Sequence, residues 1–468
     1  MNEFRSTTAN NVINLAADSN HTWIQTGSKM LFKQSCYDDI WDICRRAALV
    51  FDGVVLSGTP GVGKSCFLDF ALHRLRTDNE SVLYVHGKSG YAFIYKSDGN
   101  VEQVSIADAI SGQLAKTVDF ILLDPPEGGD PNFWGYKNLH NTKFILAVSP
   151  DCNDCQGLRK DASTVDLYMG ALLSIDEVEE MRLACYPNVP QRIVEKRYKE
   201  FGGVPRLLFK PYDSSLPDPL QTARKEQNQA LLDAVSHPRR IDNGSPEPSY
   251  QSLWKLYHIH PVIKDDGTTD YGDYTIQTCC EDAHARLRDK LMEKSVKDLW
   301  TAYSETDEGL GALKGIRFEA YAHKKILAEG LNCLALGLTK NGLSSAWPLP
   351  VSVPPNLTKV DLVNNDVGKG LQDAVALARK STTGRYLLPH FANFPVVDSI
   401  FVPHGQDNAV QLQMIAGKSQ PLPVPNAAAI TAATGSSDLY IVVPDEVTIT
   451  KKLAGSNMNQ YRIVLHEN

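Results

Sequence analysis

Residues 56–75 have the sequence LSGTPGVGKSCFLDFALHRL, and this stretch decides the fold class. Its first half, Gly58 to Ser65, matches the phosphate-binding pattern G-x-x-x-x-G-K-[ST] in full. The apolar run GVVLSG before it predicts a buried strand, and the residues up to about Arg76 predict a helix. A strand, a glycine-rich loop and a helix in this order form a P-loop, whose backbone N–H groups turn towards phosphate oxygens.

The P-loop pattern gives its polar residues separate roles. We expect Lys64 to reach the β- and γ-phosphates of a bound nucleotide, and Ser65 to supply a hydroxyl ligand to Mg²⁺. The sequence predicts ATP or GTP as the ligand and does not distinguish between them. The other residues of the nucleotide-binding loop surround the phosphates with their backbone; they are Gly58, Thr59, Pro60, Gly61, Val62 and Gly63.

Three further apolar runs predict strands of the same sheet. They are SVLYVHG at 81–87, VDFILLDPP at 118–126 and KFILAVSP at 143–150. Continuous apolar runs are typical of parallel strands that are covered on both faces. Because strands alternate with helices, we expect an α/β fold, a parallel-sheet P-loop NTPase domain.

Four polar residues outside the loop complete the expected nucleotide site. Asp124 ends an apolar strand, where it could hold the metal, or could simply begin a turn before two prolines. Glu127 could polarise the attacking water. Ser149 could contact the γ-phosphate or be a plain loop serine, and Arg206 in FGGVPRLLF could fold back onto the phosphates or be a solvated surface residue.

Composition sets the domain organisation and excludes some classes of protein. A chain of 468 residues is too long for one core, and Pro-, Ser- and Asp-rich runs at 210–221 and 236–252 place a boundary near 210–250. The net charge of −8 disfavours a globally basic nucleic-acid binder but allows a local basic groove. No apolar run is long enough to span a membrane. We expect a polar, loosely ordered segment at 1–30, the NTPase domain at 31–210, a linker and helical region at 211–300, and a smaller mixed α/β domain at 301–468.

The nine cysteines show no disulfide framework and are expected to be reduced thiols. Cys152 and Cys155 have C-x-x-C spacing, but no second pair completes a zinc site.

Four polar residues of the second domain stand among apolar ones. In the predicted helix at about 312–329, Glu319 shares a stripe with apolar neighbours, so its carboxylate points inward and needs a partner or a metal. Asp398 lies within the β-branched run VVDSIFV. In VQLQMIA, Gln411 and Gln413 share one face of a predicted strand.

Several stretches together resemble one protein family. LFKQSCYDDIWD, GTPGVGKSCFLDFALHRL and FGGVPRLLF are similar to the P-loop module of the Crinkler effectors and retrotransposon hot spot proteins. GIRFEAYAHKKIL and NFPVVDSIF with LQMIAGKSQPL are similar to the C-terminal module of that family, so the resemblance covers about residues 30–468. It implies an AAA-like NTPase domain followed by a domain of restriction-endonuclease-like fold. It also implies DNA as a partner, a host nuclear protein as a further partner, and a nuclear location; the alternative location is cytoplasmic. A homo-oligomer is a further partner that the sequence allows.

The resemblance also implies a magnesium-dependent nuclease centre, with Glu319, Asp398 and Gln413 in the ligand positions. The sequence departs from the family pattern at two points. Gln413 stands where an acidic residue is usual. Ile415 stands at the position where restriction-type nucleases have a lysine, and it also differs from the residue that the family has there. A lysine could come instead from Lys418 at the strand end, or from Lys324 or Lys325 on the helix, while Gln420 replaces a histidine of the relatives.

Two hypotheses of different classes remain open. In the first, the chain is an ATPase whose nucleotide state controls a C-terminal domain that binds and could cleave DNA with Mg²⁺. In the second, the NTPase is a switch, and an inactive nuclease-fold domain binds DNA or a host protein. A third and weaker hypothesis is a signalling NTPase that oligomerises.

Overall fold

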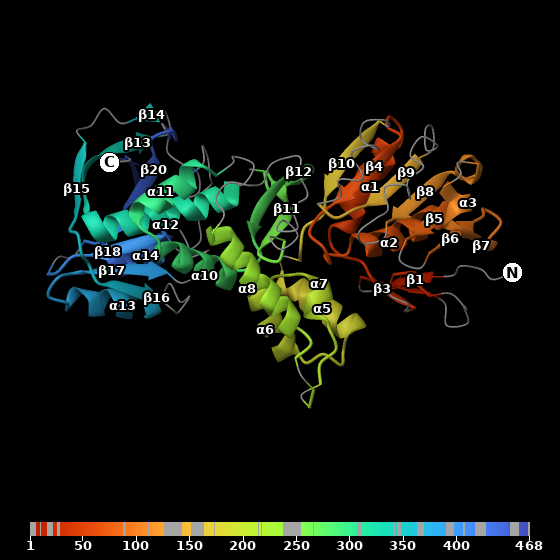
Figure 1. Ribbon diagram of the computed structural model, residues 1–468, viewed down its shortest axis with the longest axis horizontal. Coiled ribbons are helices and arrows are strands. Elements are labelled where there is room, and N and C mark those ends of the chain that lie inside the picture. Colours follow the sequence, from red (N-terminus) through yellow and green to blue (C-terminus); the bar gives the residue numbers. More distant parts are fainter. Residues whose placement is uncertain are drawn as a thin grey trace. The chain divides into compact units, whose positions relative to one another are not determined.

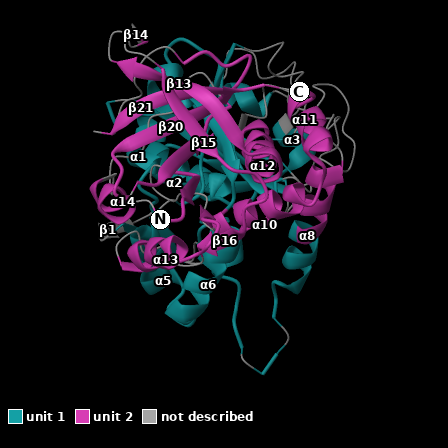
Figure 2. Ribbon diagram, turned by 90° about the vertical axis from the view of Figure 1, so that its left-hand side faces the viewer, with its two compact units in different colours: residues 1–227, 245–279 teal, residues 228–244, 280–468 magenta. Residues whose placement is uncertain are grey.

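The computed structural model divides the chain into two compact units (Figure 2). Unit 1 comprises residues 1–227 and 245–279, and unit 2 comprises residues 228–244 and 280–468. The structure describes residues 6–9, 11–15, 22–25, 29–87, 90–110, 113–125, 143–150, 163–172, 174–213, 215–216, 218–236, 254–264, 266–306, 311–339, 342–343, 348–362, 369–389, 397–405, 408–416, 427–449 and 458–466.

Unit 1 is built on a seven-stranded sheet with parallel strands at its centre (Figure 1). The first five strands along the sheet are parallel, and the last two are antiparallel. The P-loop strand β4 is separated from β8, the strand that ends at Asp124, by one intervening strand, β9. In order, the strands are β10 (Thr164–Tyr168), β4 (Gly53–Ser57), β9 (Lys143–Ala147), β8 (Phe120–Asp124), β5 (Val82–His86), β6 (Tyr91–Tyr95) and β7 (Val101–Ser105).

Alternate residues of the central strands pack into two separate cores. In β4, Val54 and Leu56 join the core that contains the P-loop helix α2 (Lys64–Thr77) and α1 (Tyr37–Ala47). Val55 points to the opposite core, with α3 (Ile106–Ile110) and the 3₁₀ turn η1 (Leu114–Thr117). A sheet covered on both faces explains why these strands are continuously apolar. The expected parallel α/β sheet is therefore confirmed.

Residues 6–32 form more structure than the expected loose segment. Strands β1 (Ser6–Ala9), β2 (Val12–Leu15) and β3 (Met30–Phe32) make a small antiparallel sheet. The first helix of unit 1, α1, begins after this sheet, at Tyr37. Trp23, between β2 and β3, is only 1% exposed and belongs to the same core as the P-loop helix.

A group of helices follows the sheet of unit 1 along the chain. Helix α5 (Ile175–Cys185) begins at Ser174, whose side chain accepts hydrogen bonds from the N–H groups of Asp176 and Glu177, as the capping pattern predicts. Helix α6 (Gln191–Phe201) ends at Gly202, as expected. They are followed by α7 (Pro205–Leu208) and α8 (Gln221–Ser236).

The region expected as a linker, 211–300, contains a hairpin that belongs to unit 1. Strands β11 (Tyr257–Ile263) and β12 (Thr269–Thr278) pair antiparallel. The chain then enters unit 2 between Cys279 and Cys280 and continues into α10 (Glu281–Met292) and α11 (Val296–Ser304). The HPRR run at 237–240 lies outside the described residues.

Unit 2 contains a nine-stranded mixed sheet. Strands β17, β18 and β19 form an antiparallel meander, after which β20 and β21 run parallel to β19. All five were expected at these places in the sequence. The strands in order are β14 (Gly342–Leu343), β13 (Leu331–Thr339), β21 (Asn459–Leu465), β20 (Asp438–Pro444), β19 (Val410–Met414), β18 (Ser399–Val402), β17 (Arg385–Pro389) and β16 (Lys359–Leu362), and β15 (Leu349–Val353) pairs with β13.

Helices cover both faces of the unit 2 sheet. Helices α13 (Lys369–Arg379) and α14 (Ala427–Thr434) contribute Val375 and Ile430 to a core with Ile400 and Leu439. The other face carries the expected helix, α12 (Gly311–Glu329), whose His323 is bonded to Tyr386 of β17. Among the described residues, no helix is long and apolar enough to cross a lipid bilayer.

We predict that Gly203→Ala destabilises unit 1 by about 3 kcal/mol, because the added methyl group overpacks a rigid site. A Cβ at Gly203 would lie 1.7 Å from the carbonyl oxygen of Leu172, which is backbone and cannot move aside cheaply. Gly272→Ala is the matched control, since its Cβ would meet only the tip of the Asp270 side chain at 3.3 Å. Thermal unfolding midpoints measure the difference, and equal midpoints for the two variants would contradict the packing seen here.

Candidate functional site

The P-loop of unit 1 takes the conformation that its glycines allow. Gly58, Gly61 and Gly63 all have positive φ angles, of 150°, 89° and 116°, which favour glycine. Gly63 is also the N-cap of α2, so the helix begins at Lys64 with its positive end directed at the loop. This is the geometry that binds phosphate groups through backbone N–H donors.

Lys64 folds back into the loop. Its ammonium group donates hydrogen bonds to the carbonyl oxygens of Gly58, at 2.5 Å, and Thr59, at 3.0 Å. The residue is 7% exposed, and burial, with the charge of Arg206, lowers the pKa of Lys64 to about 7. An anion that enters the loop would replace these carbonyl contacts with a charge-assisted bond.

Ser65 and Asp124 form the pair that can hold a magnesium ion. The Ser65 hydroxyl donates to Asp124 Oδ1 at 2.8 Å. Asp124 is the last residue of β8 and is 5% exposed. A hydroxyl and a carboxylate at the phosphate end of a P-loop are oxygen ligands of the kind that Mg²⁺ takes beside nucleotide phosphates. These two residues fit the predicted metal, which would bridge and neutralise phosphate oxygens when bound.

The backbone of Arg206 lies against the loop, and its side chain is exposed. Its backbone N–H donates to the Gly61 carbonyl at 3.4 Å. A Cβ on Gly61 would come within 2.9 Å of the Arg206 Cβ, so only glycine allows this approach. The positive charge of Arg206 contributes to the lowered pKa of Lys64.

One predicted residue of this site cannot be compared with the structure. Glu127 lies outside the described residues, as does the Cys152 and Cys155 pair. Ser149 follows the end of β9 and is exposed.

Several polar residues at the P-loop were not predicted from the sequence. The Gln34 side-chain amide donates to the Val62 carbonyl at 2.9 Å, and the Tyr37 hydroxyl donates to the Gly63 carbonyl at 3.1 Å. Both lie in the LFKQSCYDDIWD stretch, for which the sequence indicated only the resemblance to the Crinkler P-loop module. Its position directly before the P-loop strand was the only indication of a role in the site.

The hairpin β11–β12 packs directly on the P-loop within unit 1. The Ile259 N–H donates to the Thr59 hydroxyl oxygen at 2.9 Å. The neighbouring residues His258 and His260 are buried, and burial lowers the pKa of His258 to about 3 and that of His260 to about 4. Both imidazoles are therefore neutral in the folded protein at neutral pH.

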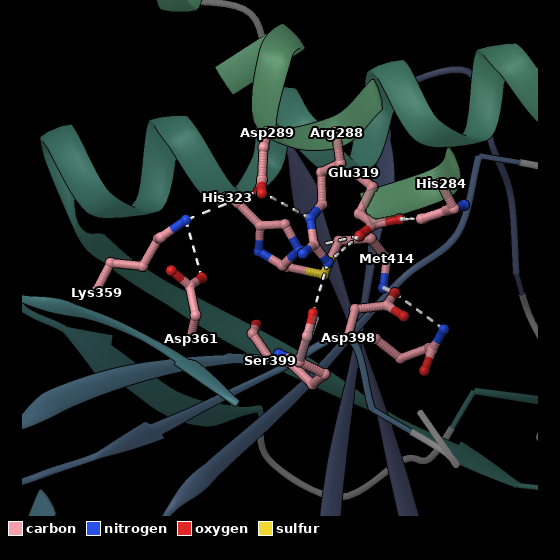
Figure 3. Close-up of polar contacts among 12 residues, drawn as sticks. His284, Arg288, Asp289, Glu319, His323, Lys359, Asp361, Asp398, Ser399 and Met414 are labelled. Carbon is pink, nitrogen blue, oxygen red and sulfur yellow. Dashed lines mark hydrogen bonds and ion pairs between the residues drawn. The ribbon is translucent and has the colours of Figure 1, made fainter. Parts of the chain in front are cut away.

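Unit 2 brings together the predicted residues Glu319, Asp398 and Gln413 (Figure 3). The Gln413 amide donates to Asp398 Oδ2 at 3.0 Å, and the Met414 N–H donates to the same oxygen at 2.7 Å. Burial and the negative charge of Glu319 raise the pKa of Asp398 well above its usual range. The aspartate therefore favours its neutral form.

Glu319 is held by three basic residues. His284 Nε2 lies 3.2 Å from Glu319 Oε2, and the Arg288 guanidinium donates to Oε1 at 3.3 Å, while His323 Nε2 is 3.6 Å from Oε1 (Figure 3). Burial would raise the pKa of Glu319. The hydrogen bonds and charges of His284, His323 and Arg288 outweigh that effect and hold the pKa well below its usual range.

No lysine side chain contacts Glu319 or Asp398 in the described part of unit 2. Lys324 donates to the Met292 carbonyl and Lys325 to the His466 carbonyl, so these two candidates point elsewhere. Ile415 is buried in the core, and Lys418 and Gln420 lie outside the described residues. The nearby cation is Arg288, which the sequence analysis missed because its helix lies some 30 residues before Glu319.

The residues of unit 2 fit a divalent cation poorly in this arrangement. Both oxygens of Glu319 face basic groups, and Gln413 offers a neutral amide whose nitrogen is turned to Asp398. Across the described residues, no three His, Cys, Asp or Glu side chains are grouped so that they could hold a metal ion. The cluster is a charge-balanced network, and we derive no metal-dependent step from it.

Comparison with known proteins finds a weak likeness to Crinkler effectors. The chain is 28% identical over 163 residues to Crinkler effector protein 15 of Phytophthora infestans, and 29% identical over 158 residues to Crinkler effector protein 16. These matches cover 34% and 33% of this chain but only 25% and 24% of those proteins. The chain thus matches about a quarter of the length of these relatives. No family model matches the chain.

Solved structures give only a distant likeness. AMPPCP-bound DnaA from Aquifex aeolicus matches 47% of this chain and 77% of its own, with 12% identity and a TM-score of 0.27. The RuvB Holliday junction branch migration motor of Thermotoga maritima matches 66% of this chain and 91% of its own, with 14% identity and a TM-score of 0.26. TM-scores this low carry no weight, and the fold assignment depends on the strand order and the P-loop geometry described above.

We predict that acid weakens unit 1 through the buried histidines of β11. An unfolded chain binds a proton at each imidazole near pH 6.5, whereas the folded pKa values are about 3 and about 4. The stabilisation is therefore complete above pH 6.5 and is lost as the pH falls towards 4, at up to about 1.4 kcal/mol per pH unit for each histidine.

Urea unfolding from pH 7 to pH 5 tests this dependence. His260→Gln removes one of the two groups, so it is expected to reduce the loss of unfolding free energy over this range. His404→Gln, on the exposed end of a strand in unit 2, is the control and should keep the wild-type dependence. An unchanged slope in His260→Gln would show that His260 is not buried as a neutral group.

Proposed function

We propose that this protein binds and hydrolyses ATP or GTP at the P-loop of unit 1, with Mg²⁺ held by Ser65 and Asp124. The observation that carries the proposal is the Ser65–Asp124 hydrogen bond of 2.8 Å beside the buried Lys64 ammonium group. It brings the hydroxyl, the carboxylate and the cation of a phosphoryl-transfer site together. Such preorganisation lowers the cost of stabilising charge on the transferred phosphoryl group.

The chemistry can be assigned to the residues of this chain. Loop N–H groups and Lys64 bind the phosphate oxygens, and Arg206 adds a second positive charge beside Gly61. Glu127, three residues after Asp124, is our proposed base that orients the attacking water. This assignment of Glu127 rests on the sequence alone.

We predict that Lys64→Ala lowers the rate of nucleotide hydrolysis by about 100-fold or more, because it removes the side-chain cation from the phosphate site. Asp124→Asn is expected to retain nucleotide binding in EDTA and to lose hydrolysis in Mg²⁺. Phosphate release and the binding of a fluorescent nucleotide measure the two effects. Lys96→Ala, which removes a half-exposed lysine paired with Glu102, is the control. Hydrolysis that survives Lys64→Ala would refute the assigned site.

We further propose that unit 2 is a nuclease-like domain that binds DNA and is controlled by the nucleotide state of unit 1. Two observations support it. Asp398 lies directly before β18 and Gln413 lies on the neighbouring strand β19 of the meander β17–β18–β19, with Glu319 on α12, and this arrangement supports the restriction-endonuclease-like resemblance. The likeness to Crinkler effectors, over 34% of this chain, supports the family resemblance from which this proposal comes. A host nuclear protein as partner, a homo-oligomer and a nuclear location belong to this proposal by that likeness alone.

The geometry favours DNA binding over cleavage for this domain. Glu319 is already neutralised by Arg288 and His284, and the lysine position is taken by Ile415. Cleavage would require these ion pairs to open, so that the carboxylates could face a metal. The alternative hypothesis, an inactive nuclease fold controlled by an NTPase, is therefore the version that the contacts support.

A continuous stretch of chain could carry the control. The P-loop residue Thr59 is bonded to Ile259 of β11, and the β11–β12 hairpin leads directly into α10. Two residues of α10, His284 and Arg288, are the partners of Glu319. A change at the phosphate site that moves the hairpin would thus reach the residues that neutralise Glu319. Each of these contacts lies within one unit, and the covalent chain joins the two.

We predict that the protein binds supercoiled plasmid in a nucleotide-dependent way and leaves it uncut. Gel shift and nicking assays, with and without Mg²⁺ and ATP, measure binding and cleavage on the same samples. Asp398→Ala and Lys64→Ala are run in parallel. Nicking that disappears in Asp398→Ala would establish cleavage in place of simple binding. Absence of both binding and nicking would refute the DNA proposal and leave the ATPase proposal intact.

A further inference from the structure

A glutamine from the N-terminal segment lies on the acidic residue of the P-loop site. The Gln25 side-chain amide donates to Asp124 Oδ2 at 2.7 Å, while Ser65 donates to Oδ1 of the same carboxylate. Both oxygens of Asp124 therefore accept a hydrogen bond, and His86 Nε2 lies further from Oδ2, at 3.8 Å, than the Gln25 amide does. Nothing in the sequence pattern of the P-loop points to residue 25.

Gln25 is held in place by a buried polar network. Its backbone N–H donates to Asp69 Oδ2 at 3.0 Å, and its side-chain amide also contacts the Tyr84 hydroxyl at 3.1 Å. Asp69 is fully buried and lies one helical turn after Ser65 on α2. Gln25 therefore contacts the P-loop helix through its backbone, and strands β5 and β8 through its side chain.

The segment that carries Gln25 is anchored two residues earlier. Trp23 is 1% exposed, and its indole N–H donates to the Ile13 carbonyl of β2 at 3.3 Å. Its ring meets His73 of α2 edge-on, with the ring centres 6.2 Å apart. The small N-terminal sheet thus fixes the position from which Gln25 reaches the nucleotide site.

A donor on Oδ2 restricts how the Asp124 carboxylate can turn. The terminal torsion of an aspartate is broad, so an unrestrained carboxylate samples many orientations. With Gln25 on one oxygen, the other oxygen remains directed at Ser65, where the metal is expected. Residues that hydrogen-bond a ligating carboxylate orient it and typically change metal affinity by about 10- to 100-fold.

We propose that Gln25 is a positioning residue for the nucleotide-bound Mg²⁺, acting through the carboxylate of Asp124. The inference rests on the proposed nucleotide site. It adds to that site a residue that lies before residue 31, where the sequence predicts the NTPase domain to begin. It makes the N-terminal sheet a component of the site. Gln25 does not contact the phosphates in this role; it sets the direction of the carboxylate that contacts the metal.

Gln25→Met separates positioning from space filling. Methionine keeps the length and shape of glutamine and leaves the backbone N–H bond to Asp69 in place, but it cannot donate to Asp124. Gln191→Met is the matched control, since Gln191 makes the same kind of amide–carboxylate bond, to Glu195 at 2.8 Å, on an exposed face of α6. Thermal unfolding midpoints establish that each variant is folded.

Two binding measurements on the full chain provide the test. The first is the affinity for a fluorescent ATP analogue in EDTA, and the second is the affinity of the protein–AMPPCP complex for Mn²⁺, followed by electron paramagnetic resonance. Gln25→Met is expected to keep the metal-free nucleotide affinity and to weaken Mn²⁺ binding by about tenfold or more. Gln191→Met is expected to change neither.

The outcomes distinguish this inference from the proposed function. Wild-type Mn²⁺ affinity in Gln25→Met would overturn the positioning role. An equal loss of metal-free nucleotide affinity would also overturn it, since that result indicates a distorted loop rather than a misdirected carboxylate. Failure of the wild-type protein to bind nucleotide at all would instead refute the P-loop proposal itself.

Discussion

The hydrogen bond from Ser65 to Asp124 is the contact on which the arrangement of unit 1 depends. Ser65 lies on α2, which follows β4, and Asp124 is the last residue of β8, while β9 separates β4 from β8 in the sheet. The bond can form only if α2 crosses above the ends of these strands and if β8 ends at Asp124 itself. This hydrogen bond lies beside the buried Lys64 and the loop glycines with positive φ angles. The continuous apolar strands support the loop and the helix from below.

Two acidic centres among the described residues have different kinds of partner. In unit 1, Asp124 accepts hydrogen bonds from a hydroxyl on Oδ1 and from an amide on Oδ2, and His86 Nε2 lies 3.8 Å from Oδ2. In unit 2, Glu319 is paired with Arg288 and His284, and Asp398 favours its neutral form. Replacing one partner of a buried ion pair by another cation stabilises the site little, because the carboxylate is already desolvated and paired within the protein. The carboxylates of the two units thus differ in their partners, with a hydroxyl and an amide as donors to Asp124 and a guanidinium as donor to Glu319.

Sequence reasoning identified the parts of the fold that repeat a local pattern. The central strands of unit 1, the capped helix at Ser174 and the helix that carries Glu319 follow from apolar periodicity and capping residues. The convergence of Asp398 and Gln413 followed from the resemblance and from strand alternation. What it missed depends on contacts between distant segments. Gln25 lies about 100 residues from Asp124, and no local pattern marks a glutamine as the donor to that carboxylate.

The hairpin β11–β12 shows why the boundary region was hardest to interpret. Its sequence lies among Pro- and Ser-rich runs that are typical of a linker, yet Ile259 is bonded to Thr59 within the P-loop. A linker that only joined two domains would have no reason to bury His258 and His260, because each buried imidazole must give up solvation. The hairpin packs against the P-loop, and this contact explains why the desolvation of the two imidazoles is tolerated. The segment directly after the hairpin contains His284 and Arg288, which are the partners of Glu319.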